Sequence, residues 1–329
     1  MADSRLLSVL VPAYNEEDNL MPFYNRLHRT LNELSDWNAE VIFIDDGSRD
    51  GSFAILQALH EKDSRVKVLR LSRNFGSWSA VLAGFRAASG DAVIWMASDL
   101  QDPPELIPRL LRSWDEGANV VWAVRAERHD PWARRIMAVL FYRLLRRIAL
   151  PAYPASGTDI CLMDRRVAKL FAQLKERNRF TQGLIMSLGF TQVMVPYVRE
   201  QRRKGHSKFN PSRLLKIGID MILGFSYFPL RLILYTGLLT GLATGILAVV
   251  ILSRILVFKA AAAVWWWVAL AVFFVGALNL VSLGVVGEYL WRVLEEARDR
   301  PQYVIRDRVG FEPGGDSPGP RESVTYSRL

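Results

Sequence analysis

Short apolar runs alternate with amphipathic stretches over residues 6–124. The runs have the length and the nearly continuous apolar character of buried β-strands, at residues 6–11, 40–44, 66–71, 92–97 and 120–124. Stretches with apolar residues at helical spacing lie between them, at residues 17–34, 51–62, 77–88 and 104–114. This alternation predicts an α/β domain with a mostly parallel sheet that is covered by helices on both faces.

A different pattern fills the last third of the chain. Residues 232–253 and 260–287 contain no charged side chain, and each stretch is long enough to cross the hydrocarbon core of a bilayer. Residues 254–259 connect them closely, so the two outer ends lie on one side of the membrane. Basic residues gather beside both outer ends, which places that side in the cytoplasm. We expect two transmembrane helices, at about 230–257 and 262–290.

The segments around these helices have patterns of their own. Residues 212–229 combine apolar and charged positions at helical spacing, which predicts an amphipathic helix in the membrane interface. Gly237, Gly241 and Gly245 recur at every fourth position, which favours close packing, either in a homo-oligomer or within the hairpin. Residues 292–329 are expected to form a cytoplasmic tail, disordered after about residue 310, where Gly, Pro and Ser are frequent.

Composition narrows the class of protein. The 329 residues carry a formal net charge of +9, but the basic residues concentrate at 125–147 and 199–216 and form no single polybasic arm. No pattern of a nucleic-acid-binding motif is present, so we expect no nucleic acid partner, but a membrane surface or a phosphate-bearing ligand. Cys161 is the only cysteine, which excludes a disulfide framework, and the four scattered histidines do not predict a zinc site.

Polar side chains follow the first four predicted strands, where each one ends. They are Tyr14, Asn15 and Glu16, then Asp45 and Asp46, then Arg73 and Asn74, and finally Asp99 and Gln101. Because the carboxyl ends of parallel strands meet at one edge of a sheet, we expect a nucleotide-type cleft there. Asp99 and Gln101 are two residues apart, so in an extended chain they point to the same side and could share a hard cation. No dinucleotide-binding or P-loop pattern is present, so such a cation, helped by Arg73, is expected to hold phosphates.

Some of these residues also have a purely structural interpretation. Asp45 and Asp46 carry acceptors suited to a ribose hydroxyl or a base, but they also fit a turn before Asp50, which would cap the next helix. Asp102 fits the cap of a helix that starts at residues 103–104. The sequence leaves both interpretations open for Asp45 and Asp46.

Four short motifs resemble one enzyme family. They are residues 11–17 (VPAYNEE), 45–52 (DDGSRDGS), 73–76 (RNFG) and 98–105 (SDLQDPPE). Together they resemble family 2 glycosyltransferases of the GT-A fold, and most closely the polyprenyl-phosphate sugar synthases, which include dolichyl-phosphate mannose synthases and bactoprenol glucosyltransferases. The resemblance extends from residue 6 to about residue 305. It implies that residues 1–211 form a Rossmann-like GT-A catalytic domain.

The resemblance implies a site for a nucleotide sugar. The residues that would contact the nucleotide are Pro12, Tyr14, Glu16, Asp45, Asp46, Arg73 and Ser98. Asp99 and Gln101 would hold Mg²⁺ or Mn²⁺ on the diphosphate. Ala97 stands where the family has the first Asp of its Asp-x-Asp-Leu-Gln pattern, which leaves Asp99 as the carboxylate for the metal.

The resemblance also implies a site for a lipid phosphate. Residues 199–211 match the acceptor loop of the family, although a basic segment beside a membrane also fits plain attraction to lipid headgroups, at about 1 kcal/mol per cation. Besides Asp99, the implied catalytic residues are Asp159, near the reacting sugar, and the phosphate-binding Arg125, Arg134, Arg135, Arg202 and Lys208.

The patterns and the resemblance together predict an inverting glycosyltransferase, a multi-pass protein of the bacterial inner (cytoplasmic) membrane with a cytoplasmic catalytic domain. It would transfer one sugar from a nucleotide sugar, with a UDP-sugar favoured, to a polyprenyl phosphate such as undecaprenyl phosphate. The product would be a lipid-linked sugar donor for modification of cell-envelope glycans. A processive polysaccharide synthase is one alternative, although its Gln-x-x-Arg-Trp motif is absent. A membrane-bound nucleotide-sugar binder without activity is another, because of Ala97.

Overall fold

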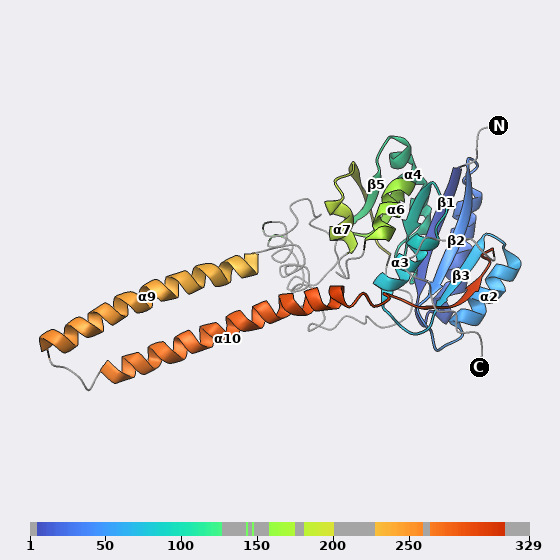
Figure 1. The fold of residues 1–329 in the computed structure, drawn as a ribbon. Helices are drawn as coiled ribbons and strands as arrows, with labels where there is room; N and C mark the ends of the chain where they lie inside the picture. The colour runs from blue at the N-terminus through green and yellow to red at the C-terminus, as the bar shows by residue number, and fades with distance from the viewer. Residues whose placement is uncertain are drawn as a thin grey trace.

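The computed structural model describes residues 5–126, 158–174, 181–200, 228–258 and 264–312, together with residues 143 and 147. The described residues form a domain built on one sheet and a hairpin of two long helices that extends away from it (Figure 1). Chain segments from before and after the hairpin contribute strands to the sheet.

The first half of the sheet follows the predicted alternation. Its strands are β1 (Arg5–Ala13), β2 (Trp37–Asp45), β3 (Val66–Leu71) and β4 (Ala92–Trp95). The helices between them are α1 (Glu17–Asn32), α2 (Ser52–Lys62) and α3 (Ser77–Ala87). β1 pairs in parallel with β2 and β4, and β2 pairs in parallel with β3, which confirms the prediction for this part.

The second half of the sheet is mixed. After β4 come the 3-10 helix η1 (Pro104–Leu106), α4 (Ile107–Asp115) and β5 (Val120–Arg125). The next elements are β6 (Thr158–Asp164), α6 (Arg165–Gln173), α7 (Thr181–Ser187) and β7 (Gln192–Tyr197). β6 lies antiparallel between β4 and β5, and β7 runs parallel to β5. The result is a mostly parallel sheet in the order β7-β5-β6-β4-β1-β2-β3-β8.

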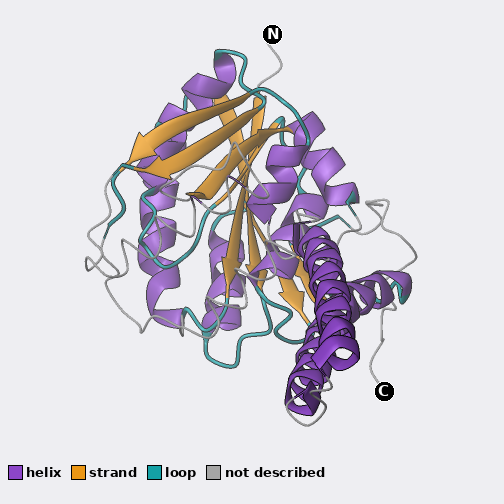
Figure 2. Cartoon of the chain, turned by 90° about the vertical axis from the view of Figure 1, so that its left-hand side faces the viewer, coloured by secondary structure: helices purple, strands orange, loops and turns teal. Residues whose placement is uncertain are grey.

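Helices cover both faces of the sheet, as predicted (Figure 2). Along β1, Leu7 and Val9 pack with residues of α1 such as Phe23, whereas Leu10 packs on the opposite face with residues of α3 such as Phe85. All five side chains are buried. Full burial of a Leu or Phe side chain contributes about 1.5–3 kcal/mol, so burial on both faces holds the strands and their polar ends in place.

The hairpin consists of α9 (Phe228–Phe258) and α10 (Val264–Ala297), which lie side by side (Figure 1). Their apolar stretches, Phe228–Ser253 and Trp267–Ala297, are long enough to cross a membrane. In each helix, the most apolar part contains no residue that is buried within the protein. Helices with such exposed apolar surface are candidate membrane spans. Among the described residues, no atom beyond the adjoining stretch of α9 lies within 4 Å of a Cβ built at Gly241, or at Gly237 or Gly245. The glycine repeat therefore does not pack against α10.

The chain returns to the sheet after the hairpin. β8 (Ile305–Val309) pairs antiparallel with β3 at the edge of the sheet. The N–H of Ser72 donates to the carbonyl of Val304 (2.9 Å), and Tyr303 and Ile305 pack against the core. The region expected to be a tail thus contributes a strand to the sheet of the domain. Residues 313–329, where disorder was predicted, and residues 212–227 of the predicted interfacial helix lie outside the described residues.

Candidate functional site

A pocket lies where the parallel strands β1, β2 and β3 end. Its volume is about 250 Å³, and its lining includes Tyr14, Arg49, Arg70, Arg73 and Arg306. The parallel pairing of these strands brings their carboxyl ends to one edge of the sheet, which is the usual place for a ligand in such folds. Two predicted nucleotide-contacting residues, Tyr14 and Arg73, therefore line the same pocket.

Asn15 joins the loops that follow β1 and β2. Its Oδ1 accepts a hydrogen bond from the N–H of Arg49 (2.9 Å), and its own N–H donates to Oγ of Ser48 (2.9 Å). Its φ of 53° is a left-handed conformation that asparagine adopts more readily than most residues. The N–H of Glu16 donates to Oγ of Ser52 (3.0 Å), which adds a third bond between the two segments. Tyr14 and Glu16, the predicted site residues on either side of Asn15, thus belong to a loop that these hydrogen bonds fasten to the loop after β2.

Asp45 and Asp46 both hold loops at this edge. Asp46 accepts hydrogen bonds from two backbone N–H groups of the loop after β3 (2.7 and 2.9 Å), and burial raises its pKa although these two donors lower it. Asp45 accepts one from the N–H of Ser48 (2.9 Å), and its Oδ2 lies 3.4 Å from Nε of Arg70. Asp50 accepts the N–H of Ser52, the first residue of α2 (3.1 Å), but α2 is capped by Gly51 without a side-chain hydrogen bond, so the predicted capping role of Asp50 is wrong. The structural interpretation thus holds for both aspartates, and their contact with a nucleotide stays a prediction.

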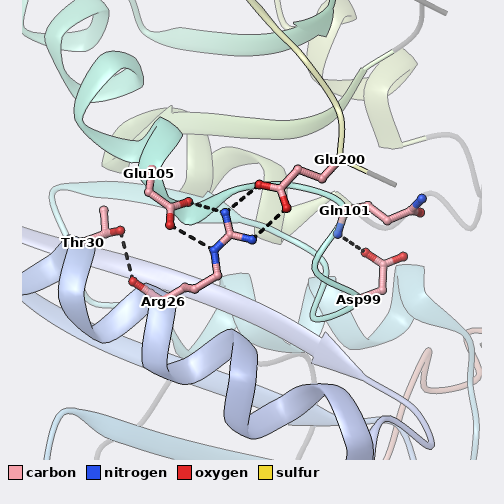
Figure 3. A network of polar contacts seen from close by, with 6 residues as sticks. All are labelled: Arg26, Thr30, Asp99, Gln101, Glu105 and Glu200. Carbon is pink, nitrogen blue, oxygen red and sulfur yellow. Dashed lines mark hydrogen bonds and ion pairs between the residues drawn. The ribbon is translucent and has the colours of Figure 1, made fainter. Parts of the chain in front are cut away.

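The loop after β4 carries the predicted metal ligands. Oδ1 of Asp99 accepts a hydrogen bond from the N–H of Gln101 (3.2 Å), and Leu100 between them has a φ of 61°. The chain is therefore not extended here, contrary to the basis of the prediction. The turn nevertheless directs the side chains of Asp99 and Gln101 to the same side (Figure 3). Oγ of Ser98 donates to the carbonyl of Pro12 (3.4 Å), so this turn lies beside the end of β1.

This turn is suited to a divalent cation. Carboxylate and amide oxygens are hard ligands, and Mg²⁺ is usually held by one or two carboxylates together with phosphates of the substrate. The part of the chain that the structure describes contains no group of three or more His, Cys, Asp or Glu side chains that could hold a metal ion. Asp99 and Gln101 therefore fit a metal that a bound diphosphate helps to coordinate.

Asp102 is buried beside this turn, with 1% of its surface exposed. The hydroxyl of Tyr197 donates to its Oδ1 (2.6 Å), and Nε of Arg199 lies 3.4 Å from the same oxygen. η1 begins without a side-chain cap, so the predicted capping role of Asp102 is wrong. Burial raises the pKa of Asp102, whereas Arg199 and Tyr197 lower it. Its carboxylate instead joins the turn with Asp99 and Gln101, called the metal turn after its predicted role, to the end of β7.

Arg125, predicted to bind a phosphate, belongs to the same group. It ends β5, where it pairs in register with Tyr197 of β7. Burial lowers the pKa of its guanidinium, Arg199 lowers it further, and Tyr197 and Asp102 raise it. Two arginines thus lie close to one carboxylate. We call these four residues, Asp102, Arg125, Tyr197 and Arg199, the Asp102 cluster; its two guanidinium groups suit an anionic ligand.

Arg26 of α1 connects two further segments (Figure 3). Its guanidinium donates to both carboxylate oxygens of Glu105 (3.0 and 2.8 Å) and to both of Glu200 (3.1 and 2.7 Å). The N–H of Glu200 also donates to the carbonyl of Gln101 (3.0 Å). The start of the predicted acceptor loop is therefore fastened to the metal turn. Glu105 and Glu200 lie 79 and 174 positions from Arg26, so no local sequence signal could have identified this network.

Other predicted catalytic residues fall outside the described part of the chain. They are Arg134, Arg135, Arg202 and Lys208, together with residues 201–211 of the predicted acceptor loop. Asp159 lies in β6. The roles of all these residues stay predictions.

The chain is similar to known proteins over nearly all of its length. Residues 8–172 match the family described as Glycosyl transferase family 2. The chain is 39% identical to the uncharacterized glycosyltransferase YkcC of Bacillus subtilis (strain 168), over 93% of this chain and 94% of that protein. It is 37% identical to a bactoprenol glucosyl transferase of Shigella phage SfV, over 92% of this chain and 98% of that protein. It is 36% identical to the prophage bactoprenol glucosyl transferase homolog of Escherichia coli (strain K12), over 91% of this chain and 98% of that protein.

Proposed function

Because the chain belongs to glycosyl transferase family 2 and is a glycosyltransferase, we propose that it transfers one sugar from a nucleotide sugar to a polyprenyl phosphate such as undecaprenyl phosphate. A UDP-sugar is the favoured donor. Relatives named bactoprenol glucosyl transferase support the acceptor, since the similarity covers both the sheet domain and the apolar hairpin. The reaction would take place at the cytoplasmic face of a bacterial membrane.

One observation carries the proposal in the structure itself. The predicted acceptor loop begins against the predicted metal turn, where the N–H of Glu200 donates to the carbonyl of Gln101 (3.0 Å). Arg199, at the start of that loop, lies beside the buried Asp102. A lipid phosphate held by the basic segment would therefore meet a sugar diphosphate held at Asp99. Such positioning of two reactants can supply much of the rate enhancement.

The acceptor needs little activation. The second pKa of a phosphate monoester is near 6, so the nucleophile is largely a dianion at neutral pH and requires no general base. Its oxygen would attack the anomeric carbon from the side opposite the departing nucleoside diphosphate, which inverts the configuration. Arg125 lies close to Arg199 and would orient the acceptor phosphate, as would the predicted Arg134, Arg135, Arg202 and Lys208.

Asp99 and Gln101 would hold Mg²⁺ or Mn²⁺, as the donor set of the turn allows. When bound, the ion would supply positive charge that stabilises the diphosphate leaving group. Asp99 contributes the carboxylate, and the hydrogen bond from Gln101 to Asp99 keeps the turn in shape. Arg73 and Tyr14 would contact the nucleotide from the neighbouring pocket.

The test is a panel of labelled nucleotide sugars, incubated with the purified full-length protein, Mn²⁺ and undecaprenyl phosphate. Transfer of a single sugar to the lipid, with one or a few of the donors, supports the proposal. A growing polymer supports a processive synthase instead. Binding of a nucleotide sugar without any turnover supports an inactive binder, the alternative that Ala97 suggests.

A further inference from the structure

β8 places an arginine at the predicted donor site from the far end of the chain. Because β8 runs antiparallel to β3, its first residues lie beside the carboxyl end of β3, at the ligand-binding edge of the sheet. The strand is held firmly there. Tyr303 packs against the core near Arg86, and the ring of Phe311 lies 5.5 Å from Nζ of Lys67.

A β-bulge lies within this strand at Arg306. Arg70 pairs with Asp307, and the next residue of β3, Leu71, pairs with Ile305, so Arg306 is the extra residue without a partner in the register. Bulges redirect a side chain and are frequent beside active sites. Here the redirected side chain of Arg306 lines the same pocket as Tyr14 and Arg73.

The pocket has a surplus of positive charge. Four arginines line it, at positions 49, 70, 73 and 306. The nearby carboxylates belong to Asp45, 3.4 Å from Nε of Arg70, and to Asp307, whose Oδ2 lies 3.7 Å from Nη1 of Arg70 and 3.8 Å from Nε of Arg306. Asp46 also interacts electrostatically with Arg73, so three carboxylates leave the equivalent of one cation uncompensated among these groups. Guanidinium groups in such a pocket favour a phosphate or the electron-rich face of a base.

We propose that Arg306 is a donor-binding residue that contacts the nucleoside diphosphate part of the donor. This inference rests on the proposed function, because it takes the pocket at the ends of β1, β2 and β3 as the donor site. It also means that the strand following the second apolar helix completes the donor pocket, with only residues 298–304 between α10 and β8. The hairpin and the donor site are thereby joined through one short connection.

Binding of UDP to the full-length protein in detergent tests the proposal. Calorimetric titration with UDP and Mg²⁺ should give a Kd about tenfold higher for Arg306→Ala than for the wild type, because a charged hydrogen bond to the ligand is lost. Arg306→Lys should fall between the two. Arg308→Ala is the matched control, since Arg308 is an exposed arginine of the same strand that does not belong to the bulge. Its Kd should equal that of the wild type.

Equal UDP affinity of Arg306→Ala and Arg308→Ala would overturn the proposal. A wild-type protein that binds none of UDP, GDP and CDP would overturn it as well. The readout needs no lipid acceptor, so it separates this inference from the proposed function. If sugar transfer to undecaprenyl phosphate is absent but Arg306→Ala still weakens UDP binding, the acceptor is wrong and the role of Arg306 stands.

Discussion

Asp99 is the residue on which the predicted metal site depends most. Ala97 provides no carboxylate at the other position of the family pattern. The hydrogen bond from the N–H of Gln101 to Asp99 shapes the turn, and an amide oxygen can accept the same bond. The negative charge of Asp99 can therefore be removed while the turn is kept.

Asp99→Asn should lower sugar transfer roughly 100-fold or more, because the amide does not supply the charge that holds a divalent cation on the diphosphate. The thermal unfolding midpoint should stay close to that of the wild type. Asp36→Asn, an exposed position away from the site, is the control and should keep full activity. Unchanged turnover in Asp99→Asn would show that the metal assignment is wrong.

Asp63 shows how one carboxylate stabilises the domain away from the site. It follows α2, where the guanidinium of Arg65 donates to it (2.9–3.1 Å) and the hydroxyl of Tyr24 is a second partner (2.8 Å). Burial opposes ionisation, but these donors hold the pKa of Asp63 at about 2. A carboxyl whose pKa is lowered by folding stabilises the protein above its unfolded pKa and loses that contribution as the pH falls through its folded pKa.

Asp63→Asn should therefore lower the free energy of unfolding by about 2 kcal/mol at neutral pH, or the unfolding midpoint by about 5 °C. The difference from the wild type should shrink as the pH is lowered from about 4 towards 2. Unfolding midpoints measured across this range check the prediction. A difference that is as large in acid as at neutral pH would contradict it.

At the scale of elements, the strands that the sequence predicted are those buried on both faces. β1 to β5 form nearly continuous apolar runs, and helices separate them, so their period and spacing are visible along the chain. β6 and β7 interrupt that alternation, and β8 (IRDRV) is a half-buried edge strand with three charged residues. Such strands are stabilised by pairing with segments that are distant in the sequence, and the periodicity of a strand's own residues does not predict that pairing.

At the site, too, local features could be predicted from the sequence, whereas contacts between distant residues could not. The positions of Asp45, Asp46 and Asp99 followed from their place at strand ends. The capping role predicted for Asp102 is wrong because Tyr197, 95 positions away, donates to its carboxylate instead. The pairing of Arg26 with Glu200 likewise depends on contacts between distant parts of the chain. Local patterns therefore identified which residues gather at this edge of the sheet, but not the contacts that join the edge to the predicted acceptor segment.

The Arg26 network allows a test of that junction. Glu200→Gln should raise the KM for undecaprenyl phosphate about three- to tenfold, because the segment that starts the acceptor loop loses a charge-assisted bond to α1. The KM for the nucleotide sugar should stay unchanged. Glu105→Gln, which weakens the other pair of the same arginine, is the matched control and should leave both values near those of the wild type. Equal effects of the two variants would show that the network has only a structural role.

At the scale of the whole molecule, the sheet and the hairpin are parts of one continuous arrangement. The chain leaves the sheet after β7, forms α9 and α10, and returns to the opposite edge of the sheet as β8 (Figure 1). A domain with chain connections to the hairpin from both edges of its sheet would be held close to a membrane that the hairpin spans. The multi-pass topology and a homo-oligomer formed through Gly237, Gly241 and Gly245 stay predictions.

The central claim is that this enzyme attaches one sugar to a polyprenyl phosphate, and the mass of the lipid product tests it most directly. Undecaprenyl phosphate should be recovered with one sugar attached to its phosphate after incubation with the full-length protein, Mg²⁺ and the matching nucleotide sugar. The nucleoside diphosphate should be released in an equal amount. Unmodified lipid with every donor tried, or lipid carrying a polymer, would contradict the account.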